Sequence, residues 1–194
     1  MASKQDVKRL IKATCEFMNT VGSIVDLDAD AGEGLKNELA MFLMYLSASD
    51  GEISWEEASS IGELCDINLT PQKMSNFIKE HNVYSVEFEN KPPISLQLLV
   101  LVENKLYESN LLDEVPDGCE MLIETYKNVA QLHMESDGYV SSSEKVDYKI
   151  YIEMMERYAN QNSLRRKKTI SGFTKNAGKI TAPTKSGVSA PKKG

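Results

Sequence analysis

The sequence predicts an all-α protein, and three observations point to this fold class. Apolar residues return at intervals of three and four along most of the chain, which is the spacing of one helix face. Only the segment 83–93 alternates in polarity, and it does so weakly, so we expect a linker there rather than a strand. One helix-turn-helix pattern occurs twice. With 194 residues, 41% of them apolar, the chain is long enough for one ordinary domain and additional segments.

The first two helices are predicted from their apolar stripes. One stripe runs from Val7 to Val21, with charged residues on the other faces of the helix. The polar segment from Asp26 to Gly34 contains glycines and is expected to form a loop. The next helix spans about 35–47, and its predicted core face consists of Leu39, Phe42, Leu43 and Leu46.

The remaining helices follow from start signals and composition. Thr70 before Pro71 is typical of a helix start, because threonine caps the first turn and proline suits the first helical position. The segment 94–107 is apolar around most of its circumference, which favours a central, covered helix over the alternative of a buried strand. Asp117-Gly118 is expected to form a turn. Further helices are predicted from near Trp55, from near Met121 and over 142–158.

A short motif around an Asp-Gly pair is present in two copies. Asp137 lies 87 residues after Asp50, and the surrounding residues match at the same spacing. The aligned segments are Ser49-Asp50-Gly51-Glu52-Ile53-Ser54 with Glu57, and Ser136-Asp137-Gly138-Tyr139-Val140-Ser141 with Glu144. The apolar stripes on both sides also match, so we predict two similar helical hairpins that pack against each other.

One interpretation of the motif is purely structural. The glycine would adopt the left-handed conformation that ends a helix. Ser54 would cap the next helix, with Glu57 as the second half of a capping box, and Ser141 and Glu144 would repeat this pairing. Such a cap stabilises a helix by about 1 kcal/mol. On this interpretation the motif needs no ligand.

The other interpretation is a cation site. Asp50 and Glu57 stand on either side of a tight turn, and Asp137 and Glu144 do the same, so the four carboxylates are candidate metal ligands. Hard cations, Ca²⁺ above all, prefer such oxygen ligands. Additional candidate ligands are Glu52, Glu135 and His133.

The first copy matches only the second half of an EF-hand calcium-binding loop. With Asp50 at loop position 5, Gly51 and Glu57 stand at positions 6 and 12, as that loop requires. The leading positions 1 and 3 hold Leu46 and Ala48, which cannot supply carboxylates. We therefore do not expect an EF-hand here.

From Leu35 to Tyr158 the chain resembles the TerB-like family, named after the tellurite-resistance protein TerB. The resemblance rests on a small residue, Asp and Gly, then an aliphatic residue, a Ser and a Glu, in both copies. It implies an all-helical bundle, divalent-cation binding at acidic residues and a role in stress resistance rather than catalysis. The chain departs from the family pattern in its N-terminal helix, its basic tail and the Ser, where Ala is typical, before each Asp.

Charge is unevenly distributed along the chain. The net charge is −7, but residues 163–194 contain nine Lys or Arg and no Asp or Glu, whereas the first 162 residues contain 13 basic and 29 acidic residues. The segment 163–194 holds too few apolar residues to form a core, so we predict a disordered basic tail. The cluster Arg165-Arg166-Lys167-Lys168 favours weak, salt-sensitive contact with anionic lipid or nucleic acid.

Three segments and a non-enzymatic function are therefore predicted. The segments are an N-terminal helix and loop (1–34), a TerB-like helical domain (35–162) and the basic tail (163–194). The leading hypothesis is a cytoplasmic divalent-cation-binding or scaffold module of a tellurite-resistance-type stress response, with a protein partner. The alternative is a protein-interaction or membrane-surface adaptor that uses the tail, with purely structural motifs. An enzyme is the least supported class, because neither a nucleophile nor a general base accompanies the carboxylates, and Cys15, Cys65 and Cys119 are expected to be buried thiols.

Overall fold

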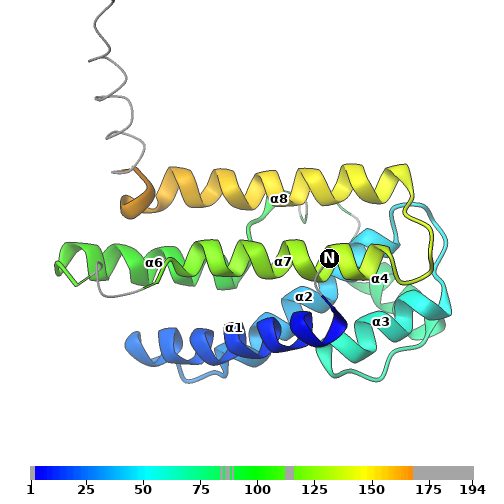
Figure 1. Ribbon diagram of the computed structural model, residues 1–194, viewed down its shortest axis with the longest axis horizontal. Coiled ribbons are helices and arrows are strands. Elements are labelled where there is room, and N and C mark those ends of the chain that lie inside the picture. Colours follow the sequence, from blue (N-terminus) through cyan, green and yellow to red (C-terminus); the bar gives the residue numbers. More distant parts are fainter. Residues whose placement is uncertain (1–2, 84, 86–87, 89, 112–115, 168–194) are drawn as a thin grey trace, which may run out of the picture.

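The computed structural model describes residues 3–83, 85, 88, 90–111 and 116–167. In this part of the chain the regular structure is helical throughout and contains no strand, which confirms the all-α fold. The helices are α1 (Lys4–Ile24), α2 (Ala31–Ser47), α3 (Trp55–Cys65), α4 (Pro71–His81), α6 (Ile94–Glu108), α7 (Gly118–Met134) and α8 (Ser142–Asn162) (Figure 1).

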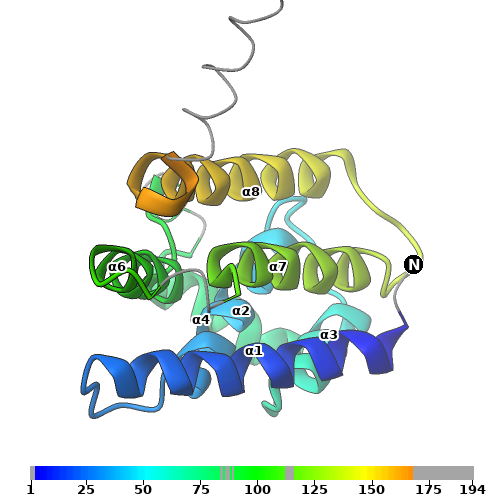
Figure 2. The same ribbon diagram turned by 60° about the vertical axis from the view of Figure 1, so that its left-hand side comes forward.

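The centre of the bundle is α2, which packs against all the other helices named above. Its predicted core residues Leu39, Phe42, Leu43 and Leu46 are completely buried, as expected. In both views α7 lies between α8 on one side and α1 on the other (Figures 1 and 2). The chain therefore forms one layered bundle in which α1 shares the core of the later helices.

The two predicted hairpins pack together through aromatic side chains. Phe42 on α2 lies 4.5 Å from Tyr151 on α8 and 5.2 Å from Tyr126 on α7, measured between ring centroids. Such contacts contribute beyond the area that they bury. The predicted association of the two repeats is thus confirmed.

Several boundaries differ from those expected from the sequence. The loop predicted over 26–34 ends at Asp30, whose side chain accepts a hydrogen bond from Glu33 N at 2.8 Å and so starts α2 at Ala31. Asp117 caps α7 in the same way, through Glu120 N at 2.8 Å, so it is a helix start rather than a separate turn. The last helix continues to Asn162.

The helix over 94–107 was expected to be covered on several sides, and this was wrong in part. Leu99 and Val102 of α6 are buried, but Ile94 is 68% exposed and Leu101 is 50% exposed. The exposed residues line an apolar groove of about 510 Å³ between α6 and α8. The helix covered on most sides is α2, in which only Glu33, Gly34 and Asn37 are exposed.

Two glycines in the first turns of α2 are expected to respond oppositely to alanine. A Cβ at Gly32 would lie 2.8 Å from the carbonyl oxygen of Cys15, because α1 and α2 pack closely there. A Cβ at Gly34 would meet no atom within 4 Å. We expect Gly32→Ala to lower the free energy of unfolding by about 2 kcal/mol and Gly34→Ala to raise it by about 0.5 kcal/mol. Urea unfolding of both variants tests this, and equal changes would contradict the close packing.

The beginning of the predicted tail is bonded to the bundle. Leu164 N donates to Asn104 Oδ1 at 2.8 Å, and Ser163 is completely buried. Residues 163–167 therefore belong to the folded body, and the tail prediction was wrong for them. The remaining part of that prediction, 168–194, lies outside the described residues.

Among the described residues, the helices are all too short or too polar to span a lipid bilayer.

Candidate functional site

The first motif forms the turn between α2 and α3. Gly51 has a φ of +84°, in the left-handed region, and Asp50 Oδ1 accepts a hydrogen bond from Glu52 N at 3.0 Å. Ser54 Oγ accepts from Glu57 N at 3.0 Å, while Glu57 Oε2 accepts from Ser54 N at 2.7 Å. The predicted capping box is present.

The second motif repeats this geometry between α7 and α8. Gly138 has a φ of +81°, and Asp137 Oδ1 accepts from Tyr139 N at 2.8 Å. Ser141 Oγ accepts from Glu144 N at 3.0 Å, and Glu144 Oε2 accepts from Ser141 N at 2.8 Å. The sequence repeat is thus a structural repeat, down to individual hydrogen bonds.

Burial divides the four candidate ligands into two pairs. Asp50 and Asp137 are exposed, whereas Glu57 is 7% exposed and Glu144 is 4% exposed. The aspartates shape the turns and face solvent, and the glutamates lie at the helix starts beneath them. Each motif therefore offers one exposed and one buried carboxylate.

The two motifs, in the α2–α3 and α7–α8 connections, lie at the same end of the bundle (Figure 1). Burial is the main cause of the raised pKa of Glu144, and the negative charges of Glu57 and Asp50 raise it further. Burial likewise raises the pKa of Glu57, with a further contribution from Asp50. The first repeat thus acts electrostatically on the second.

A buried hydrogen-bonded pair connects the two hairpins behind the motifs. Ser47 Oγ on α2 lies 2.8 Å from His133 Nε2 on α7, and the Ser47 side chain also bonds to Glu57. The Ser47 hydroxyl thus links the His133 ring on α7 to the Glu57 carboxylate at the start of α3. Both residues are essentially unexposed, so a substrate could not reach this Ser–His pair.

His133 is held in its neutral form. Burial lowers its pKa to about 4, and the nearby negative charge of Asp137 opposes this shift only in part. The sequence left open whether His133 joins the acidic site. The structure places it beneath the site, in contact with Ser47.

A different acidic group, which the sequence analysis missed, brings possible ligand atoms closest together. One atom each of Glu103, Asp117 and Cys119 lies within 4.8 Å of the others, whereas the four motif carboxylates form no such group among the described residues. Glu103 is 4% exposed and directly follows the apolar run 98–102 of helix α6. An acidic residue is seldom buried without a partner, so its place next to an apolar run is a signal in the sequence for a buried polar contact.

Glu103 binds the start of α7 and the end of α8. Its Oε1 accepts from Gly118 N at 3.0 Å and from Cys119 N at 3.3 Å. Its Oε2 accepts from Ser163 Oγ at 3.3 Å and from the Cys119 thiol at 3.5 Å. The carboxylate thus caps α7, where the helix dipole favours negative charge.

This second group does not fit a metal ion. Burial strongly raises the pKa of the Cys119 thiol, so the thiolate that a metal would bind is disfavoured. Arg166 Nη2 lies 2.8 Å from Glu120 Oε2 and 3.4 Å from Asp117 Oδ1, so a cation of the chain itself already balances these carboxylates. The group joins α6, α7 and the segment after α8.

Comparison of the sequence with models of known protein families, with curated proteins and with solved structures gives no match. The resemblance to the TerB-like family stays a prediction.

Proposed function

We propose that this chain is a non-enzymatic, TerB-like divalent-cation-binding or scaffold module in a stress response of the tellurite-resistance type. The observation that carries the proposal is that both repeats place carboxylates at the same end of the bundle, near enough for the charges of the first to act on the second. The charges of Glu57 and Asp50 in the first repeat raise the pKa of Glu144 in the second. Like charges brought together in a partly buried place favour a cation that neutralises them.

The chemistry of the donors supports a hard cation. The capping hydrogen bonds use Oε2 of both Glu57 and Glu144, so coordination through Oε1 would leave the helix caps intact. Asp50 and Asp137 add exposed carboxylates at the two turns. Ca²⁺ accepts six to eight oxygen ligands in flexible arrangements and tolerates water among them, which suits a site assembled from two separate turns.

A full-chain titration with an Asp50→Asn/Asp137→Asn variant tests this proposal. Asparagine keeps the Oδ1 that accepts from Glu52 N and Tyr139 N, so the turns remain while two negative charges are removed. By calorimetry with Ca²⁺, Mg²⁺ and Zn²⁺, we expect binding of Ca²⁺ by the unaltered protein and at least about tenfold weaker binding by the variant.

The matched control is Asp26→Asn/Asp28→Asn, which makes the same change in net charge at exposed positions between α1 and α2. This control should bind the cation as the unaltered protein does. If the unaltered protein binds no cation, or if both double variants lose binding equally, the motifs are turn and cap structures only. That outcome would favour the alternative, a protein-interaction or membrane-surface adaptor that uses the basic segment after α8.

A further inference from the structure

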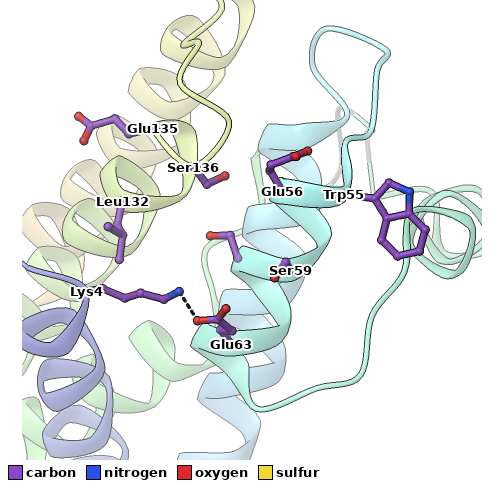
Figure 3. Close-up of a pocket in the computed structure, with 9 residues that line it drawn as sticks. Lys4, Trp55, Glu56, Ser59, Glu63, Leu132, Glu135 and Ser136 are labelled. Carbon is purple, nitrogen blue, oxygen red and sulfur yellow. Dashed lines mark ion pairs between the residues drawn. The ribbon is translucent and has the colours of Figure 1, made fainter.

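A groove that borders both repeated motifs lies between α3 and the end of α7. Its volume is about 640 Å³, and Lys4 at the start of α1 closes one side of it (Figure 3). Three glutamates, Glu56, Glu63 and Glu135, line it together with the apolar side chain of Leu132. The groove thus combines an apolar patch with an excess of negative charge.

One lysine of the chain already binds in this groove. The ammonium group of Lys4 forms an ion pair with Glu63 Oε2, and in Figure 3 the lysine side chain reaches across to α3. Within the described residues, Glu56 and Glu135 form no ion pair, so two negative charges at the groove remain unbalanced. A ligand that fits this surface would carry further lysine or arginine side chains.

We propose that the groove docks the chain's own basic C-terminal segment, residues 168–194, through its lysines near Lys192 and Lys193. This segment contains six lysines and no acidic residue, so its charge is complementary to the groove. It also provides several cations in one chain, which compensates for the weakness of each surface ion pair.

The segment has the length to reach the groove. Its starting point is fixed, because Arg166 pairs with Asp117 and Glu120 at the first turn of α7. The groove lies at the other end of α7, a helix of 17 residues, which corresponds to about 25 Å. A flexible chain of about 25 residues has a root-mean-square end-to-end distance of about 28 Å. This match between chain length and span is the condition for a high effective concentration.

Energy transfer from Trp55 to the segment tests the proposal. Trp55 is the single tryptophan and stands at the edge of the groove, with its ring turned away from Lys4 and Leu132 (Figure 3). An acceptor dye can be attached through Ala190→Cys in the full chain, because the three native cysteines are buried. In EDTA and at about 20 mM salt we expect efficient transfer, which falls at least twofold at about 500 mM salt.

Two double variants separate the groove from the general charge of the bundle. Glu56→Gln/Glu135→Gln should lower transfer at low salt at least twofold, and Glu16→Gln/Glu80→Gln, exposed residues on α1 and α4, should not. Equal transfer in both variants, or an equal loss in both, would overturn docking at this groove. Transfer that rises with protein concentration would also overturn it, since the segment would then bind a second copy. EDTA makes all outcomes independent of cation binding at the motifs.

Discussion

Replacing Glu103 by alanine is expected to lower the free energy of unfolding by about 3 kcal/mol, from the loss of several buried hydrogen bonds. The Glu103 carboxylate accepts from Gly118 N, Cys119 N and Ser163 Oγ. Without the carboxylate these donors would stay in the protein interior with no acceptor. A buried donor without a partner costs its full desolvation free energy. Urea unfolding measures the effect, provided that both proteins have the same m-value, which is the slope of the free energy of unfolding against urea concentration.

Two further variants make this result specific. Glu103→Gln keeps an acceptor oxygen near Gly118 N, so its loss should be smaller than that of the alanine variant. Glu108→Ala removes an exposed carboxylate from the same helix and should change stability by less than about 0.5 kcal/mol. If the alanine variants at 103 and 108 were equally stable, the Glu103 carboxylate would not stabilise the contact of α6 with the start of α7 and the end of α8.

Acidification from about pH 6.5 to pH 4 is expected to cost the unaltered protein about 3 kcal/mol more stability than a His133→Gln variant. Burial lowers the pKa of His133 from 6.5 to about 4 in the folded protein. Between these values the unfolded chain binds the proton and the folded chain does not, so falling pH favours unfolding. Glutamine suits the comparison because its amide can still hydrogen-bond to Ser47 but does not titrate.

The difference between the two proteins has to be measured, because other groups titrate in the same range. The pKa values of Glu57 and Glu144 are raised in the folded state. For these carboxylates the folded chain binds more protons above about pH 4.5, so falling pH favours folding and opposes the effect of His133. Equilibrium unfolding from pH 4 to pH 7.5 gives both stability curves. If the free energies of unfolding of the two proteins change with pH in the same way, burial does not keep His133 neutral.

The acidic end of the bundle offers two different environments to a positive charge. The motif carboxylates Glu57 and Glu144 are buried and bound to backbone N–H groups, which suits a small ion at a fixed place. Glu56 and Glu135 line an open groove, where lysine side chains can bind without a fixed arrangement. A cation and the basic segment would therefore occupy different parts of the same acidic end of the bundle.

The sequence by itself determined the features that depend on neighbours a few residues away. Both predicted capping boxes and both left-handed glycines follow from residues at most three positions apart, and the structure contains all four features. The buried face of α2 also follows from local spacing, because a helix repeats every 3.6 residues. These interactions form within one turn, and so a short pattern is enough to predict them.

Only the tertiary structure decided what lies between distant segments. Glu103 meets Ser163 across 60 residues, and Ser47 meets His133 across 86. Local spacing gives no information on such contacts, because they depend on how whole helices pack. The same is true of Gly32, which resembles a loop residue in sequence but lies where α1 and α2 pack too closely for a Cβ. The sequence alone thus identified the four motif carboxylates, whereas packing determined which of them are buried and whose charges act on one another.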